Sequence, residues 1–201
     1  SENYQLRVGG RKIKDFNQDG TIDNKDKYYA GSTLPSAFGG ISNRVSYKNW
    51  TLDMMMSYTI RRKMMNMVKN SAFNFTKTFG TIMADPSKVT FWQKPGDETD
   101  YPSLEFADQG YIGQFDGDID SNIENVNYLR LKSITLSYEM PAKWFKNKIK
   151  GLSLYVTGQN LFLWTNYSGT DPEVVDPYTG KDTGQQYPLN RSVTFGFNLK
   201  F

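Results

Sequence analysis

Apolar and polar side chains alternate along several stretches of this 201-residue chain. The clearest stretch is residues 193–201, where Val193, Phe195, Phe197, Leu199 and Phe201 alternate with Thr194, Gly196, Asn198 and Lys200. A strict period of two predicts a β-strand with one apolar face and one polar face. Such a strand fits a membrane barrel, whose outer face meets lipid, and it also fits a soluble β-sandwich.

The same alternation predicts four more strands, and the chain is therefore expected to be all-β. They cover residues 38–47, 50–60, 128–140 and 152–164. The first two are separated only by Lys48 and Asn49, which predicts a hairpin with a very short turn. Within residues 128–140 the apolar positions change parity, so we expect a β-bulge near Lys132 and Ser133.

The predicted connections alternate between short and long. Residues 48–49 and 142–151 form short connections, and residues 61–127 and 166–187 form long ones. Outer-membrane barrels place short turns on the periplasmic side and long loops outside, whereas a soluble sandwich needs no such rule. The loop lengths therefore favour the barrel, with the C-terminus on the periplasmic side.

Five strands are too few to close a barrel, which needs about eight. An unclosed sheet in lipid would also leave backbone hydrogen-bonding groups unpaired at its edges. We therefore expect the chain to be the C-terminal part of a larger barrel.

Composition agrees with this expectation and excludes several kinds of chemistry. The hydrophobic content is 38% and the mean hydropathy is -0.62, values that suit a barrel with a polar lumen. The net charge of +3 gives no support to nucleic-acid binding. The chain has no Cys and no His, which excludes disulfides, thiol catalysis, Ser-His-Asp hydrolysis and zinc sites built from those residues.

No carboxylate stands out as catalytic, so the chain is not expected to be an enzyme. Asp171, Glu173 and Asp176 lie in a Pro-containing stretch where turn chemistry is a better explanation than a glycosidase carboxylate pair.

Residues 15–26, with the sequence DFNQDGTIDNKD, have the spacing of a calcium-binding loop of the EF-hand type. Alternate side chains supply oxygens to one ion, and Gly20 permits the sharp bend. The predicted ligands are Asp15, Asn17, Asp19, the backbone carbonyl of Thr21, Asp23 and Asp26. The flanking residues do not have the pattern of EF-hand helices, and an Asx-rich turn without a metal is the alternative.

Four segments resemble the C-terminal region of SusC/RagA-family TonB-linked outer-membrane transporters. They read DFNQDGTIDNKD with GSTLPSAFGGISNRVSYKNWTLDM, NYLRLKSITLSYEMPAKW, GLSLYVTGQNLFLWTNYSGTDPEV and YPLNRSVTFGFNLKF. Their order and spacing match the family together, over most of the chain outside residues 61–120.

The resemblance implies the last strands of a 22-stranded plugged barrel in the outer membrane of a Gram-negative bacterium. It implies import of glycans or peptides, energised through TonB, with a SusD-like surface lipoprotein closing over the mouth. The family carries its plug in an N-terminal part that this sequence does not contain. The polar positions expected to line the lumen are Ser42, Arg44, Asp53, Thr59, Thr135, Ser137, Glu139 and Lys200. The alternative is a soluble calcium-dependent β-sandwich that acts in binding or adhesion.

Overall fold

The computed structural model is all-β and describes residues 8–10, 13–68, 90–99, 101–103, 119–145, 150–176 and 178–200. The predicted terminal residue Phe201 lies outside these residues. The chain divides into two compact units, one made of residues 1–31 with 65–123 and the other of residues 32–64 with 124–201. No helix in the described ranges is long and apolar enough to cross a membrane.

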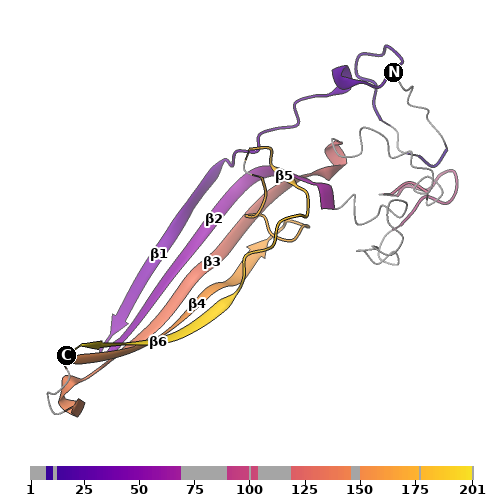
Figure 1. Cartoon of the computed structure of the whole chain (residues 1–201). Coiled ribbons are helices and arrows are strands. Elements are labelled where there is room, and N and C mark those ends of the chain that lie inside the picture. The colour runs from indigo at the N-terminus through magenta and orange to yellow at the C-terminus, as the bar shows by residue number, and fades with distance from the viewer. Residues whose placement is uncertain are drawn as a thin grey trace. The chain divides into compact units, whose positions relative to one another are not determined.

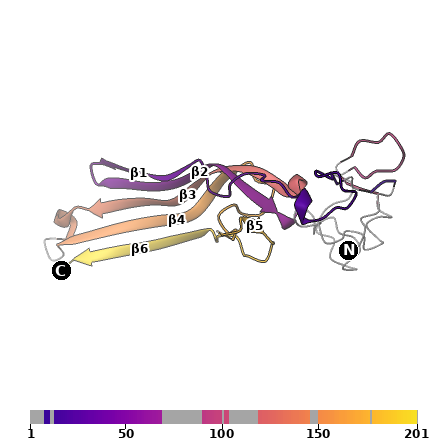
Figure 2. The ribbon, with the colours of Figure 1, turned by 90° about the horizontal axis from the view of Figure 1, so that it is seen from above.

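The second unit is built on one antiparallel sheet, drawn in Figures 1 and 2. Its long strands are β1 (Ala37–Tyr47), β2 (Trp50–Asn66), β3 (Ile123–Met140), β4 (Gly151–Thr165) and β6 (Ser192–Lys200). They lie side by side in the order β1-β2-β3-β4-β6, and the two-residue strand β5 (Lys181–Asp182) pairs with β2. The described strands thus form a single sheet, and two packed sheets of a sandwich are not seen among them.

The strand pairing confirms the predicted faces, because residues directly opposite each other share a face of the sheet. In β1 and β2, Ile41 pairs with Met56 and Val45 with Leu52, whereas Arg44 pairs with Asp53. In β4 and β6, one face carries the pairs Leu152–Leu199, Leu154–Phe197 and Val156–Phe195, and the other carries Ser153–Asn198 and Thr157–Thr194. One face of the sheet is therefore apolar and the other is polar.

The apolar face is open in this unit and carries large side chains. On β6, Phe195 is 79% exposed and Phe197 is 67% exposed. At the end of the sheet with the short turns, the rings of Trp50 on β2 and Tyr138 on β3 lie 4.7 Å apart. Burying such a surface stabilises a protein by roughly 25 cal/mol per Å² of apolar area. The face therefore requires an apolar environment that the described residues do not supply.

The predicted turn at Lys48 and Asn49 is confirmed, and it is fastened to the next strand. Lys48 has a positive φ of 54°. The main-chain N–H of Glu139 on β3 donates to the carbonyl of Asn49 at 2.8 Å, and the Asn49 amide donates to the Glu139 carbonyl at 2.6 Å. These two bonds hold the β1–β2 turn against β3.

The predicted bulge is also confirmed. The register of β3 and β4 shifts between Leu131 and Ser133, and β4 has one more residue than β3 in this interval. Asn160 on β4 takes the left-handed conformation there, with φ 51°, which asparagine adopts at low cost.

The sequence made β2 and β3 too short, because it ended the first at residue 60 and began the second at residue 128, and this prediction is corrected. The long connection expected at residues 61–127 begins after Asn66 and ends before Ile123. The extra residues include Arg61, Arg62 and Lys63 on β2, which do not show apolar alternation. Contacts from distant segments hold them: β3 and β5 pair with β2, the Arg61 N–H donates to the Asn127 side chain at 2.9 Å, and the Lys63 N–H donates to the Ser32 carbonyl at 3.2 Å.

Candidate functional site: the polar face of the sheet

The predicted lumen residues gather on the polar face of the sheet. Ser137 on β3 donates through Oγ to the Thr51 carbonyl at 3.3 Å, which aligns the polar positions of β2 and β3. Further along β3, the Thr135 and Thr157 hydroxyls are 2.9 Å apart. The polar face is thus continuous from strand to strand and consists mostly of hydroxyl groups.

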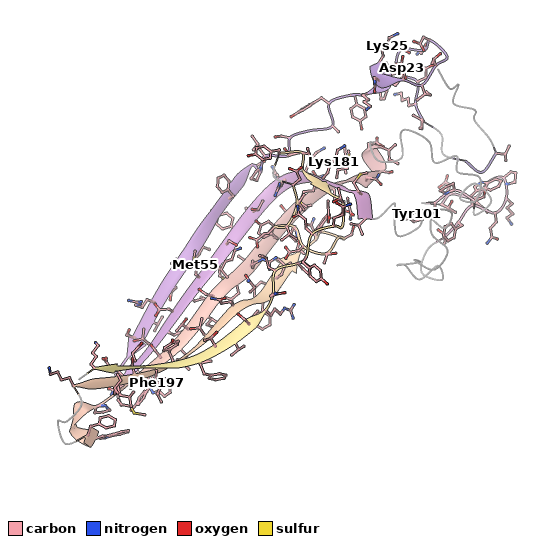
Figure 3. All side chains as sticks on the ribbon, in the orientation of Figure 1. Asp23, Lys25, Met55, Tyr101, Lys181 and Phe197 are labelled. Atoms are coloured by element: carbon pink, nitrogen blue, oxygen red, sulfur yellow. The ribbon has the colours of Figure 1, made fainter. Side chains whose placement is uncertain are left out.

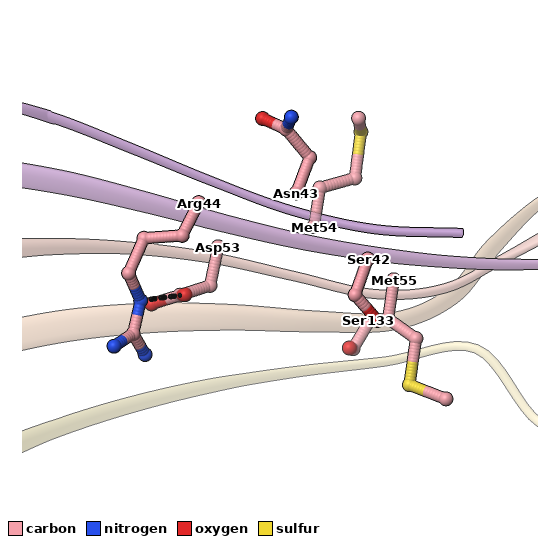
Figure 4. Close-up of a pocket in the computed structure, with 7 residues that line it drawn as sticks. All are labelled: Ser42, Asn43, Arg44, Asp53, Met54, Met55 and Ser133. Atoms are coloured by element: carbon pink, nitrogen blue, oxygen red, sulfur yellow. Dashed lines mark hydrogen bonds and ion pairs between the residues drawn. The ribbon is translucent and has the colours of Figure 1, made fainter. Parts of the chain in front are cut away.

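A hollow of about 440 Å³ lies on this face and spans three strands. It is lined by Ser42, Asn43, Arg44, Asp53, Met54, Met55 and Ser133. Figure 4 shows Arg44, Asp53 and Met55 pointing to one side of the sheet, and Asn43 and Met54 to the other. Arg44 Nε donates to Asp53 Oδ1 across the β1–β2 pair. The hollow therefore combines an exposed ion pair, a thioether and two hydroxyl groups.

The long loop after β4, residues 166–191, folds over one end of the polar face. Glu173 accepts hydrogen bonds from Ser57 Oγ at 3.3 Å and from Lys132 Nζ at 2.9 Å. Thr59, on the same face of β2 as Ser57, is only 6% exposed. The expectation that Thr59 lines a hydrated lumen is therefore wrong, because the loop covers this end of the face.

A buried ion pair anchors this loop to the sheet. Arg130 on β3 and Asp171 in the loop are joined through Arg130 Nη2, and both side chains are 3% exposed. The second oxygen of Asp171 accepts from the Leu189 N–H at 3.2 Å, and the Glu173 N–H donates to the first at 3.0 Å. Arg130 Nε also forms an ion pair with Glu173, so the guanidinium faces two carboxylates of the loop. Burying charges is costly unless they are paired, and these charges are.

A small apolar cluster completes the attachment of the loop. Tyr167 and Val175 from the loop pack with Met64 on β2 and Val126 on β3. The Tyr167 hydroxyl donates to Asp182 Oδ2 at 2.6 Å. Burial, and then this hydrogen bond to Asp182, raise the pKa of Tyr167 well above its ordinary value. The loop is therefore packed through both apolar and polar contacts.

Turn chemistry explains one of the three carboxylates of this loop that could suggest a glycosidase, Asp176, whereas Asp171 and Glu173 form ion pairs with the sheet. The Asp176 carboxylate accepts from the N–H groups of Tyr178 and Thr179, and these bonds lower its pKa. Asp171 and Glu173 are engaged by Arg130 and Lys132 as described above. The sequence did not predict this cluster of charged side chains. Its one sign in the sequence is the charged residue Arg130, which stands among the apolar residues Tyr128, Leu129 and Leu131.

The predicted calcium loop lies in the other unit and is folded by its own side chains. The Asp15 carboxylate accepts from the N–H groups of Gln18 at 2.7 Å and Gly20 at 2.8 Å. Gly20 has φ 79°, the sharp bend that the motif requires. Asn17 Oδ1 accepts from the Asp19 N–H, and Asp19 Oδ1 accepts from the Thr21 N–H at 2.9 Å.

The second half of the loop is a short 3-10 helix, η1 (Asn24–Asp26), capped by Asp23. Asp26 is buried, and its carboxylate accepts from the N–H groups of Asp23 and Phe16, each at 2.8 Å. The hydrogen bond from Asp23 is the main reason that the pKa of Asp26 is lowered. The Lys25 ammonium lies 3.9 Å from an Asp19 oxygen and 4.0 Å from an Asp23 oxygen. Figure 3 labels Asp23 and Lys25 in this helix.

The predicted ligands therefore share one loop but do not converge on one point. Nowhere in the described ranges do three or more acidic side chains form a group that could hold a metal ion. Asp15 and Asp26 direct their oxygens at main-chain N–H groups, while Asp19 and Asp23 also face Lys25.

Comparison with known proteins agrees with the fold. No protein-family model matches the chain. TonB-dependent receptor P26 of Formosa agariphila is 31% identical over 207 residues, which cover 96% of this chain and 20% of that receptor. TonB-dependent receptor SusC of Bacteroides thetaiotaomicron is 30% identical over 191 residues, covering 93% of this chain and 17% of SusC.

Solved structures give the same result. The RagAB peptide transporter aligns with a TM-score of 0.67 at 29% identity, over 92% of this chain and 20% of that chain. The RagAB peptide importer in its open-open state aligns with a TM-score of 0.66. The relatives are named as receptors and importers, in agreement with the expectation that the chain is not an enzyme. The chain is thus a homologue of the SusC/RagA-type TonB-dependent receptors and spans about a fifth of the length of the relatives it matches.

Proposed function

We propose that this chain forms a section of the barrel wall of a TonB-dependent importer in the outer membrane of a Gram-negative bacterium. The observation that carries the proposal is the two-faced sheet. Phe195 and Phe197 stand on one face of β6, and Thr194 and Asn198 stand on the other. In a barrel, lipid covers the apolar face and the solute path meets the polar one.

The names of the relatives support the proposed partners and substrate. A receptor of this kind takes energy from TonB and works with a SusD-like surface lipoprotein that closes over its outer mouth. The imported solutes are glycans or peptides, and the alignment with the RagAB peptide importer favours peptides. The hydroxyl-rich polar face, with its single Arg44–Asp53 pair in the hollow, suits passage of a hydrophilic solute.

Uptake by cells tests this proposal. Cells that make the receptor containing this chain should accumulate labelled short peptides or oligosaccharides only when TonB and the lipoprotein are both present. The receptor itself should require detergent for solubility and should migrate faster on gels before heating, as folded barrels do. Water solubility without detergent, or uptake that does not depend on TonB, would contradict the proposal and favour a soluble binding module.

We also propose that the 15–26 loop binds Ca²⁺. Its donors are carboxylate and amide oxygens, which hard cations prefer, and Gly20 already makes the bend that the spacing requires. The Lys25 ammonium beside Asp19 and Asp23 supports a cation position between these two side chains. Calcium would displace the lysine there, and the remaining oxygens would turn toward the ion.

Calorimetric titration of the detergent-purified receptor with Ca²⁺ tests the second proposal. Asp19→Asn should weaken binding at least tenfold, because it removes a ligand charge. Lys25→Gln should strengthen binding, because it removes a competing cation. If Lys25→Gln weakens binding or has no effect, calcium does not replace the ammonium, and heat release that is unchanged by Asp19→Asn would place the ion elsewhere.

A further inference from the structure

The hollow on the polar face has an unusual chemical composition for a barrel wall. Its neighbours along β3, β4 and β6 are mainly hydroxyl and amide groups, such as Thr135, Thr157 and Thr194. The hollow instead presents the Arg44 guanidinium, with 72% of the side chain exposed, and the Met55 thioether, 48% exposed. The hollow therefore places a strong hydrogen-bond donor beside an apolar group.

Arg44 is held in place but is not saturated. Across the described part of the chain it hydrogen-bonds through Nε alone, to Asp53. A guanidinium has five N–H donors in a fixed plane, so the two terminal nitrogens keep donors for another acceptor. In Figure 4 these nitrogens lie on the side of the guanidinium away from Asp53. Asp53 therefore orients the guanidinium and leaves its outer edge for a ligand.

The other groups of the hollow limit the kind of ligand. Ser42 and Ser133 offer hydroxyl groups that donate or accept hydrogen bonds. Met55 offers a flexible apolar surface that adapts to differently shaped side chains. A ligand that fits these groups carries an anionic group beside an apolar group of variable shape. A peptide carboxylate with its neighbouring side chain is such a ligand. A neutral sugar would accept hydrogen bonds from Arg44 but offer it no counter-charge, and it would leave Met55 without an apolar partner.

We propose that this hollow is a subsite for a carboxylate of the transported peptide, bound by the outer edge of Arg44 while the adjacent peptide side chain contacts Met55. The inference rests on the proposed import function and goes beyond it by naming the chemical group that is recognised. Asp53 has two opposing effects, because it positions Arg44 and also repels an incoming anion. Asp53→Asn keeps an oxygen that accepts from Arg44 Nε and removes only the negative charge, so it should change carboxylate binding in the direction opposite to Arg44→Gln.

The test uses the complete receptor in detergent and two labelled pools of short synthetic peptides that lack Asp and Glu. The pools share their sequences, and one ends in a carboxylate while the other ends in a carboxamide. The wild-type protein should prefer the carboxylate pool roughly fivefold, the scale of an exposed ion pair. Arg44→Gln should abolish this preference, Arg44→Lys should keep part of it, and Asp53→Asn should increase it roughly twofold to fivefold.

Arg191→Gln is the matched control, since it makes the same chemical change at an exposed arginine outside the hollow. It should leave the preference unchanged, and gel migration before heating should show that every variant is folded. Equal binding of both pools by a wild-type protein that does bind peptides would overturn the subsite alone. A preference that falls in both Arg44→Gln and Asp53→Asn would also overturn it, because the pair would then be only structural. Failure of the wild-type protein to bind either pool would overturn the subsite and peptide import together.

Discussion

Tyr155 on β4 lies across Gly196 on β6, its register partner on the polar face. A Cβ atom built on Gly196 would stand 2.4 Å from the Tyr155 ring, a distance that real side chains do not reach. The glycine therefore leaves room for the tyrosine to lie flat over the neighbouring strand. An aromatic ring that covers a strand glycine is a known way of strengthening a cross-strand pair.

Gly196→Ala should destabilise the folded barrel by about 1–3 kcal/mol, because an added methyl in a packed site forces the ring out of position. Gly151→Ala is a suitable control in the same strand pair, since its added Cβ would stand 3.7 Å from the nearest side-chain atom, Lys200 Cδ. The folded fraction on gels after graded heating measures both. Adding Tyr155→Ala to Gly196→Ala should remove the clash. We therefore expect the double variant to be at least as stable as the single variant Tyr155→Ala.

The buried ion pair between Arg130 and Asp171 predicts strong coupling between the 166–191 loop and the sheet. Asp171→Asn leaves the buried Arg130 with Glu173 as its remaining counter-charge and removes a charged hydrogen-bond partner, which should cost about 1.5–3 kcal/mol of loop attachment. Limited proteolysis should then cut the loop much faster than in the wild type. Lys132→Gln changes a lysine whose side chain is 32% exposed and should cost under about 1 kcal/mol. Similar cleavage rates for both variants would show that the buried pair does not anchor the loop.

Attachment of the same loop should weaken in strong alkali. The pKa of Tyr167 is raised in the folded protein by burial and by the hydrogen bond to Asp182. A raised pKa means that the stabilisation is fully present below the ordinary tyrosine value, about 10, and is lost as the pH rises above it. Tyr167→Phe should have lower stability near pH 7 but a smaller further loss above about pH 10. Parallel pH profiles of the two proteins, measured by proteolysis or melting, would contradict this assignment.

Neighbouring residues of β6 allow a test of which face meets lipid. Phe195→Arg places a charge on the apolar face and should cost about 2–4 kcal/mol if that residue lies near the membrane midplane. Thr194→Arg places the same charge on the polar face, where water can solvate it, and should be tolerated. The measurement is the fraction of receptor that assembles into the heat-modifiable form. A larger loss for Thr194→Arg than for Phe195→Arg would mean that the faces are reversed.

The sequence predicted those features that depend on neighbouring residues. Alternation placed Phe195 and Thr194 on opposite faces, the two residues Lys48 and Asn49 predicted the turn, and a change of parity located the bulge. It did not predict that β2 continues through Arg61, Arg62 and Lys63, because these residues have no apolar period of their own.

The contacts between the 166–191 loop and the sheet could not be predicted from the sequence either. Arg130 and Asp171 are 41 positions apart, and nothing in either segment alone specifies the other as its partner. The calcium motif shows the opposite case. Its spacing is fully visible in the sequence, and the bend at Gly20 agrees with that spacing. The direction of each carboxylate oxygen, however, depends on hydrogen bonds such as the one that the Phe16 N–H donates to Asp26.

The fastening of the Lys48–Asn49 turn to Glu139 also bears on the order in which the sheet assembles. A two-residue connection makes β1 and β2 the pair with the smallest loop-closure cost, whereas β3 must be brought back across the whole segment 67–122. We expect the β1–β2 hairpin to form first and to present the Asn49 main-chain carbonyl and side-chain amide to Glu139 when β3 pairs. β3 can pair with β2 only after the 67–122 connection is closed, and this closure cost grows slowly with length, so insertions within 67–122 should slow assembly less than a lengthened turn at residues 48–49.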